Sequence, residues 1–307
     1  MVFNWGRTPS RSTPLSAFSE ALDSREFVVT CELNPPKGVE LDLLFEKAEN
    51  LRNVAVAINV TDSASSRMTM GNLAVAHMLS DRGIEPILQM TCRDRNRLAL
   101  QSEVLAAHVL GIRNVLIMSG DPPQYGDHPE TKPVFDLDAS ALLGAIRDMR
   151  GGADMAGNEL DGSPDVFPGA VVNPGASDLD GEIGRMESKL EAGARFFQTQ
   201  AVYEAASFEQ FARRVEGFGV PLLAGMIVLK SPKMAAFLNE KVPGITVPDA
   251  LIQRIEDAAD RRAAGVEITA GLIRDVREMC QGVHIMAIGW EAEIPRIVQS
   301  AGLGVAA

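Results

Sequence analysis

The amino-acid sequence predicts an α/β fold, a single (βα)8 barrel, on three observations. Eight short apolar segments of strand length recur along the 307 residues. They lack strict alternation of polar and apolar residues, which is typical of parallel strands buried on both faces of a sheet. Segments with helical spacing of apolar residues separate them. An open doubly wound sheet is the alternative, but no GxGxxG motif follows an early strand.

Each predicted strand is followed by a stretch long enough for a helix. The strands cover residues 27–33, 54–61, 86–91, 114–119, 169–173, 195–200, 221–226 and 283–288. After the third strand, Leu98, Leu105 and Val109 recur at helical spacing and predict a helix that ends before Gly111. Gly219 marks a similar point, where a helix stops and the next strand begins. The repeated order of strand and helix is that of a barrel.

Three segments do not follow this repeat. Residues 1–20 carry two arginines among serine, threonine and proline and predict a flexible N-terminal tail, which leaves residues 21–307 for the barrel. Residues 122–137 follow the fourth strand and belong to the active-site face of a barrel, either as a lid or as a plain surface loop. Residues 150–167 precede the fifth strand, on the opposite face, and are interpreted as a tolerated insertion.

Composition and charge argue against several classes of protein. A net charge of −12 disfavours binding to nucleic acid or to an anionic membrane, because phosphate groups would be repelled. No apolar run reaches the roughly 18 residues of a transmembrane helix, and the N-terminus lacks the apolar region of a signal peptide. Cys31, Cys92 and Cys280 form no CxxC motif and predict neither disulfides nor a thiolate metal site. We expect a cytoplasmic protein.

Polar residues at the carboxyl ends of the strands are the candidates for chemistry, because these ends converge at the mouth of a barrel. Glu32 lies in an otherwise apolar strand, where burial would favour its protonated form and suit it to general-acid catalysis; a structural ion pair is the alternative. Asp121 follows Gly120, which permits close approach of a planar ligand, or it is an ordinary turn residue. The candidates are Glu32, Thr61, Gln89, Thr91, Asp121, Asn173, Gln200 and Lys230.

The remaining polar candidates are less specific. Asn173 and Gln200 each offer a donor and an acceptor, which suits recognition of an amide-rich heterocycle, although structural amides are commoner. Lys230 suggests a lyase that forms a Schiff base, but it stands beyond the seventh strand, where a solvated lysine is commoner. The histidines predict no metal site, because they are scattered over the chain: His77, His108, His128 and His284.

Seven motifs occur in a specific order. They are CELNPPKG, NVTDSASSRMTMGN, ILQMTCRDRNR, VLIMSGDPP, VVNP, RFFQTQAVY and AGMIVLKSPKMAAFLNEKVPGITVP, at or after strands one to seven. Together they resemble the methylenetetrahydrofolate reductase family over about residues 25 to 302, and most closely the reductase-like modules of bifunctional methyltransferase-reductases. The resemblance implies a flavin-binding (βα)8 barrel, that is, a TIM barrel.

The resemblance also implies a reaction in one-carbon metabolism and methionine biosynthesis. The family reduces 5,10-methylenetetrahydrofolate to 5-methyltetrahydrofolate, with FAD carrying the hydride from NADH or NADPH. Glu32 matches the general acid that acts when the imidazolidine ring opens. Asp121 matches the aspartate that stabilises the iminium intermediate, and Gln200 matches the glutamine that contacts the pterin. The matches to the FAD site are Thr61, Gln89, Ser119, Gly120, Asp121, Asn173 and Lys189.

The sequence departs from the best-known bacterial members of the family at three of these positions. Those members have a histidine where Gln89 stands, an arginine where Ser119 stands and a tyrosine near Asn173, and these differences remove groups that would help to hold FAD. Weak flavin binding and a flavin-independent variant therefore stay open. A folate-binding subunit that receives electrons from a partner protein also stays open, as does a homo-oligomer.

Overall fold

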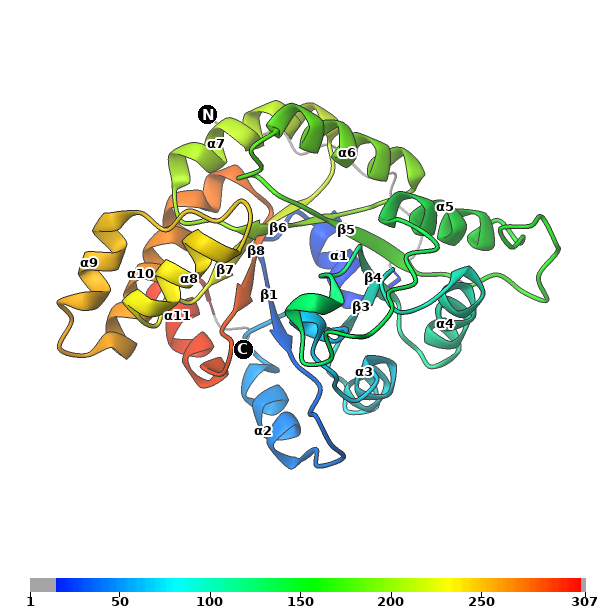
Figure 1. Ribbon diagram of the computed structural model, residues 1–307, viewed down its shortest axis with the longest axis horizontal. Coiled ribbons are helices and arrows are strands. Elements are labelled where there is room, and N and C mark those ends of the chain that lie inside the picture. Colours follow the sequence, from blue (N-terminus) through cyan, green and yellow to red (C-terminus); the bar gives the residue numbers. More distant parts are fainter. Residues whose placement is uncertain (1–14, 305–307) are drawn as a thin grey trace.

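The computed structural model describes residues 15–304 and contains a closed barrel of eight parallel strands in sequence order. Each strand pairs with the next, and β8 closes the barrel against β1. Figure 1 shows the strands at the centre and the helices around them. The predicted (βα)8 TIM barrel is confirmed. The strands are β1 (Val28–Leu33), β2 (Ala57–Val60), β3 (Pro86–Thr91), β4 (Asn114–Met118), β5 (Phe167–Val172), β6 (Phe197–Ala201), β7 (Leu222–Ile227) and β8 (Gly282–Met286).

Helices connect consecutive strands and cover the outside of the barrel (Figure 1). The connection from β7 to β8 is the longest and holds three α-helices. The α-helices are α1 (Ala17–Asp23), α2 (Asp42–Leu51), α3 (Asn72–Ser80), α4 (Arg97–Val109), α5 (Ala139–Arg150), α6 (Leu179–Ala192), α7 (Ala205–Val215), α8 (Pro232–Lys241), α9 (Asp249–Glu256), α10 (Arg261–Val276) and α11 (Ile294–Ser300). The short 3-10 helices are η1 (Ala64–Ser66), η2 (Pro123–Tyr125), η3 (Glu216–Phe218), η4 (Arg277–Met279) and η5 (Glu291–Glu293).

The strands form where side chains are buried on both faces of the sheet. All residues of β2, β3 and β7 are buried, as the lack of polar alternation predicts. Strand β3 coincides with the predicted segment 86–91. Strand β2 is shorter than the predicted segment 54–61, because the backbone amides of Val54 and Ala55 donate to the carbonyl of Leu51 and complete the turn after α2.

Helix α1 closes the amino-terminal end of the barrel. Phe18 is fully buried and packs edge-on against Phe167 and Phe196, with ring centroids 6.2 and 5.0 Å away. The hydroxyl of Ser16 accepts from the backbone amide of Ser19 and caps the helix. This corrects the end of the tail assigned to residues 1–20, because the contacts of Phe18 attach α1 to the barrel. Residues 1–14 of the predicted tail are not among the described residues.

Helix α4 ends at Val109, before Gly111, as the sequence predicts. Leu100, Val104 and Ala107 pack into the core. In contrast, Leu98 and Val109 are 73% and 81% exposed. Both sets of residues have helical spacing, so periodicity alone does not decide which set faces the sheet. The tertiary packing of the helix, which includes contacts with α5, makes this choice.

The two long segments outside the repeat lie at opposite ends of the barrel. In the segment 122–137, the backbone amide of Val134 donates to the carbonyl of Arg93, which follows β3. This segment therefore joins the loops at the carboxyl ends of the strands, the face that the sequence predicted. The segment 150–167 leads into β5 from the other end and contains a short antiparallel bridge of its own.

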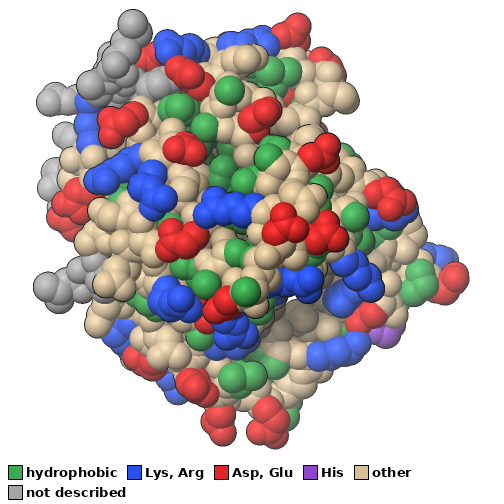
Figure 2. Space-filling model, turned by 90° about the vertical axis from the view of Figure 1, so that its left-hand side faces the viewer, with side chains coloured by type: hydrophobic (Ala, Val, Ile, Leu, Met, Phe, Trp, Pro, Cys, Tyr) green, Lys and Arg blue, Asp and Glu red, His purple; other side chains and the backbone are tan. Residues whose placement is uncertain are grey.

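The surface carries charges of both signs. Figure 2 shows acidic and basic side chains interspersed over the side of the molecule that it presents. Exposed ion pairs such as Arg213 with Glu209 contribute to this mixture. On that side, the net negative charge is not gathered into one patch. Within residues 15–304, no helix has the length and apolar character that a membrane crossing requires.

Candidate active site

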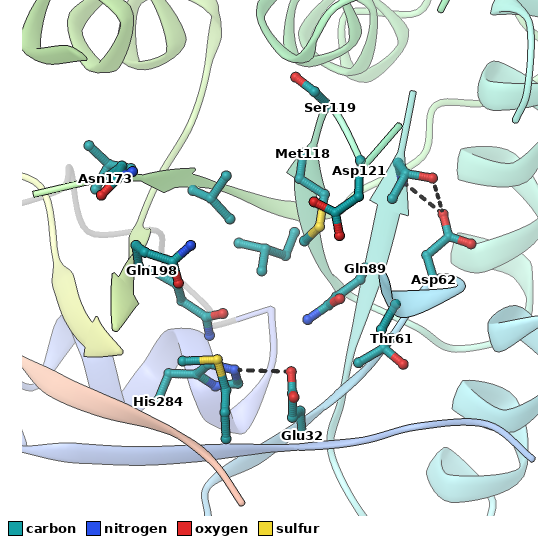
Figure 3. A pocket seen from close by; sticks show the side chains of 18 of the residues that line it. Glu32, Thr61, Asp62, Gln89, Met118, Ser119, Asp121, Asn173, Gln198 and His284 are labelled. Atoms are coloured by element: carbon teal, nitrogen blue, oxygen red, sulfur yellow. Dashed lines mark hydrogen bonds and ion pairs between the residues drawn. The ribbon is translucent and has the colours of Figure 1, made fainter. Parts of the chain in front are cut away.

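The carboxyl ends of the strands surround a cavity of about 510 Å³. This volume is within the range of ligand pockets, about 300–1,000 Å³. Figure 3 shows Glu32 on one side of the cavity and Asp121 across from it. Every residue that the sequence assigned to substrate or FAD lines this cavity: Glu32, Thr61, Gln89, Ser119, Gly120, Asp121, Asn173, Lys189 and Gln200. The roles of these residues stay predictions.

Glu32 faces a histidine from the neighbouring strand. The register of β1 and β8 places Thr30 beside His284. Side chains alternate along a strand, so Glu32 points to the same side as Thr30. The Oε2 atom of Glu32 lies 3.6 Å from Nε2 of His284, and the two side chains are 16% and 4% exposed (Figure 3). At this distance the two groups form an ion pair when the imidazole is protonated and the carboxyl group is ionised.

His284 is a site residue that the sequence did not indicate. The sequence predicts the strand that carries His284. Because side chains alternate along a strand, His284 and Met286 lie on the same face of β8. However, the closure of β8 onto β1 is needed to bring the histidine to Glu32, because the two residues are far apart in the chain.

Gly120 and Asp121 follow β4 and form one wall of the cavity. Gly120 has a φ of 90°, and a Cβ atom there would lie 2.9 Å from the Cβ atom of Thr91. Only glycine fits this position without strain, and it leaves the wall without a side chain. The backbone carbonyl of Asp121 accepts hydrogen bonds from Ser66 and Arg93. Its carboxylate is directed into the cavity (Figure 3).

Arg93 is a second cavity residue that sequence reasoning missed. It is only 3% exposed, and its guanidinium group binds Asp94 and the hydroxyl of Ser66. It thereby ties the loops after β2, β3 and β4 to one another. The run CRDRNR contains several charged residues and gives no signal for burial of one of them, since such runs are usually solvated.

The polar side-chain atoms of Thr61 and Asn173 form hydrogen bonds with other residues of the chain. The hydroxyl of Thr61 donates to Oδ1 of Asn34 at 2.7 Å. The Nδ2 atom of Asn173 donates to the carbonyl of Pro243 at 3.1 Å, and its Oδ1 accepts from the backbone amide of Gly175 at 3.1 Å. Asn173 therefore connects neighbouring loops at the edge of the cavity, and one hydrogen of its side-chain amide remains available to a ligand.

Lys189 provides a cation at the cavity wall. Its Nζ donates to the carbonyl of Val171 at 2.7 Å, which leaves further N–H donors for a ligand. Burial lowers the pKa of Lys189, against the opposing effect of Glu182. Glu182 is 8% exposed and accepts from the backbone amide of Asn173. An anionic ligand group here would favour the charged form of the lysine.

Two glutamines of β6 line the cavity. The predicted Gln200 is partly exposed, and its Oε1 accepts from the backbone amide of Ala201 at 3.0 Å. Gln198, which was not predicted, is 2% exposed and contacts Asn59 and Thr30. Alternation along RFFQTQ is the signal that could have found it, because it places both glutamines on one side of the strand.

Lys230 is not among the residues that line the cavity. Its Nζ donates to the carbonyl of Ile288 and lies 5.4 Å from the ring centre of Trp290. This position disfavours a lyase that would use Lys230 at the mouth of the barrel. In the part of the chain that the structure describes, no group of three acidic, histidine or cysteine residues could hold a metal ion.

The closed barrel carries a facing carboxyl group and imidazole at its carboxyl-terminal mouth, the end at which α/β-barrel enzymes have their active sites. The family model described as methylenetetrahydrofolate reductase matches residues 17–302. The chain therefore belongs to the methylenetetrahydrofolate reductase family.

The curated relatives are distant in sequence. The chain is 26% identical to methylenetetrahydrofolate reductase 2 of Schizosaccharomyces pombe, over 72% of this chain and 36% of that protein. It is 24% identical to a probable methylenetetrahydrofolate reductase (NADPH) of Caenorhabditis elegans, over 92% and 43%. It is 23% identical to 5,10-methylenetetrahydrofolate reductase of Pectobacterium carotovorum subsp. carotovorum, over 85% of each. The chain thus spans less than half of the first two relatives and most of the third.

Solved structures match at the level of the fold. A 2,3-dimethylmalate lyase matches with a TM-score of 0.51 and 13% identity, over 95% of this chain and 87% of that one. An oxaloacetate acetylhydrolase matches with a TM-score of 0.52 and 12% identity, over 94% and 85%. At these identities the similarity supports the barrel fold alone.

Proposed function

We propose that this chain is an FAD-dependent methylenetetrahydrofolate reductase. It would interconvert 5,10-methylenetetrahydrofolate and 5-methyltetrahydrofolate, with NADH or NADPH as electron donor. One observation carries the proposal: Glu32, Asp121 and Gln200, selected by their motifs, line one cavity. Membership of the family supports the same activity.

Glu32 is the proposed general acid. Opening of the five-membered ring of the folate breaks a C–N bond, and the leaving nitrogen needs a proton. Glu32 is sheltered in the cavity, and His284 at 3.6 Å can return a proton to it between turnovers. A pair of this kind suits a site that must protonate a weakly basic nitrogen near neutral pH.

Asp121 and Gln200 are the proposed contacts of the pterin. Ring opening produces a cationic iminium, and a carboxylate about 4 Å from a unit charge gains about 4 kcal/mol at an effective dielectric constant of 20, before desolvation is subtracted. The Oε1 atom of Gln200 accepts from Ala201, so the Nε2 donor of Gln200 is the atom free to meet an acceptor on the ring.

The residues of the cavity fit a flavin. A planar ring can approach the backbone at Gly120, where a Cβ atom would collide with Thr91. Lys189 has N–H donors to spare for a phosphate or a ring oxygen. Bound FAD would supply the carrier of hydride between nicotinamide and folate. The further contacts that we propose for FAD are Thr61, Gln89, Ser119, Asp121 and Asn173.

Two narrower points belong to this proposal. Within the family, we propose that the chain is most similar to the reductase-like modules of bifunctional methyltransferase-reductases. Electron delivery by a partner protein, or a flavin-independent reaction, is the second candidate. The differences at Gln89 and Ser119 favour this second candidate, because they remove groups that would hold FAD. In addition, both polar side-chain atoms of Asn173 already form hydrogen bonds within the chain.

The purified full chain tests the proposal. With added FAD we expect the visible absorption of a bound flavin and a stabilisation of about 2.7 kcal/mol at a hundredfold excess over Kd. With NADH or NADPH and 5,10-methylenetetrahydrofolate we expect 5-methyltetrahydrofolate. Folate turnover without any effect of FAD would support the flavin-independent candidate. A protein that neither binds FAD nor converts folate under these conditions would contradict the proposal.

A further inference from the structure

Arg93 lies in the wall of the cavity that also carries Asp121. It follows β3, is 3% exposed and is among the residues that line the cavity. A Cβ atom at Gly120 would lie 3.2 Å from the Cβ atom of Arg93. A guanidinium group at this depth needs partners for its charge and its donors, because an unpaired buried charge is costly. These partners decide whether Arg93 can bind a ligand.

All five N–H donors of the guanidinium group have partners within the chain. Nε donates to Oδ1 of Asp94 at 2.9 Å, and Nη2 donates to Oδ2 of Asp94 at 2.7 Å. The second hydrogen of Nη2 faces the carbonyl of Ser63 at 3.4 Å. Nη1 donates to the hydroxyl of Ser66 at 2.9 Å and to the backbone carbonyl of Asp121 at 3.3 Å. A guanidinium group has five such donors, so none remains for a ligand.

The charge of Arg93 is compensated as well. The two parallel hydrogen bonds to Asp94 form a bidentate ion pair. Without Asp94, the guanidinium group would place a positive charge beside Asp121 and offset its negative charge. Arg93 therefore affects a ligand through the groups that it holds in place.

Arg93 and Ser66 together hold the backbone carbonyl of Asp121. The hydroxyl of Ser66 accepts from Nη1 of Arg93 and donates to this carbonyl. The three residues thus join the loops after β2, β3 and β4. Ser66 has a φ of 55°, a left-handed conformation that is unfavourable for residues other than glycine and persists where neighbouring contacts maintain it.

The neighbours of Asp121 in the chain explain why this carbonyl needs an anchor. Gly120 precedes it with a φ of 90°, and glycine adopts other backbone conformations readily. Pro122 follows it with a φ of −58°, which its ring fixes. The freedom of the segment therefore lies on the glycine side. Rotation there would carry the carboxylate of Asp121 out of the cavity into which it is directed (Figure 3).

We infer that Arg93 is a positioning residue for Asp121, acting through Ser66 and the backbone carbonyl. This inference rests on the proposed role of Asp121 beside the iminium. The contacts hold the carboxylate in the cavity, and the pairing with Asp94 leaves its charge undiminished. Loss of the side chain of Arg93 should therefore resemble loss of the carboxylate of Asp121.

A crystal structure of the full chain without ligands tests the contact itself. In the wild type we expect Arg93 and Ser66 to bind the carbonyl of Asp121. In the double variant Arg93→Met with Asp94→Asn, which keeps the net charge unchanged, we expect the segment 120–122 to shift while the eight strands stay in place. This measurement needs no folate activity, so it separates failure of the inference from failure of the proposed function.

The same double variant should slow the folate half-reaction about 10- to 100-fold and change flavin reduction by less than about twofold, because only the iminium needs the carboxylate. In an Asp121→Asn background its further effect should be below about twofold, since both changes act through one group. Arg93→Lys should also be slow, because an ammonium group cannot reproduce the planar set of donors. Arg150→Met, which replaces a half-buried arginine bonded to Asp165 at the other end of the barrel, is the control with wild-type rates.

The flavin potential gives a readout that a general loss of packing would not move in a fixed direction. The double variant should raise the potential, as Asp121→Asn does, because the carboxylate leaves the neighbourhood of the flavin. In the Asp121→Asn background the double variant should raise it no further. Equilibration of the FAD-bound protein with a redox dye measures this shift.

Three results would overturn the inference. The first is a wild-type crystal structure in which neither Arg93 nor Ser66 contacts the carbonyl of Asp121, which needs no variant to fold. The second is a wild-type folate rate in the folded double variant or, if that variant does not fold, in Ser66→Ala. The third is an equal loss of rate with and without the carboxylate of Asp121, which would show that Arg93 acts independently of it.

Discussion

Replacement of Glu32 by glutamine separates the two half-reactions of the proposed enzyme. Glutamine has nearly the same shape, and its amide can face Nε2 of His284 as donor or acceptor, 3.6 Å from the present carboxylate oxygen. We therefore expect the free energy of unfolding to change by less than about 1 kcal/mol. The variant should also bind FAD as the wild type does, because the exchange removes no group assigned to the cofactor.

The expected loss falls on the folate half-reaction. An amide cannot give up a proton as a carboxyl group does, and removal of a general acid costs about 10² to 10⁴ in rate. This corresponds to about 3 to 5 kcal/mol of activation free energy. Reduction of the flavin by NADH or NADPH involves no proton transfer from Glu32, so its rate should stay within about twofold, a difference below about 0.5 kcal/mol.

Anaerobic stopped-flow absorbance measures both steps. Bleaching of the flavin by nicotinamide reports the first, and recovery of its colour with 5,10-methylenetetrahydrofolate reports the second. Glu40→Gln, an exposed residue in the loop after β1, serves as the control and should leave both rates unchanged. If Glu32→Gln slowed both half-reactions equally, or slowed neither, Glu32 would be a structural residue and the proposed mechanism would be wrong.

Asp121→Asn should slow the folate half-reaction about 10- to 1,000-fold and raise the flavin potential, because it removes a negative charge near both groups; an unchanged rate in stopped flow would contradict this. Lys189→Met should weaken FAD binding in a titration. The same variant should stabilise the FAD-free protein against urea at neutral pH, because burial lowers the pKa of Lys189 and so disfavours its charged form. That gain should vanish as the pH rises from the folded-state pKa to the ordinary value for lysine, since the neutral amine has no such penalty; a gain independent of pH would refute it. Phe18→Ala should lower the free energy of unfolding by about 3 to 5 kcal/mol, because it empties the closed end of the barrel, and a loss below about 1 kcal/mol in urea unfolding would show that α1 contributes little.

The sequence by itself predicted the strand segments, apart from their exact ends, and many of the residues that line the cavity. The runs that became β3 and β7 lack strict alternation of polar and apolar residues because both of their faces are buried, and the sequence alone shows this pattern. Glu32 and Asp121 could be selected because polar residues at strand ends converge in a barrel, whatever the details of packing. The resemblance added Gly120, which follows β4, and Lys189, which reaches the cavity from α6.

Only the tertiary structure decided which residues meet across the barrel. His284 stands more than 250 positions from Glu32, and closure of β8 onto β1 brings them together. The burial of Arg93, the face that α4 presents to the core and the docking of Phe18 also depend on neighbours that are remote in the chain. Periodicity specifies a face of an element but not its partner. The partner is set by the packing of side chains that no local pattern encodes.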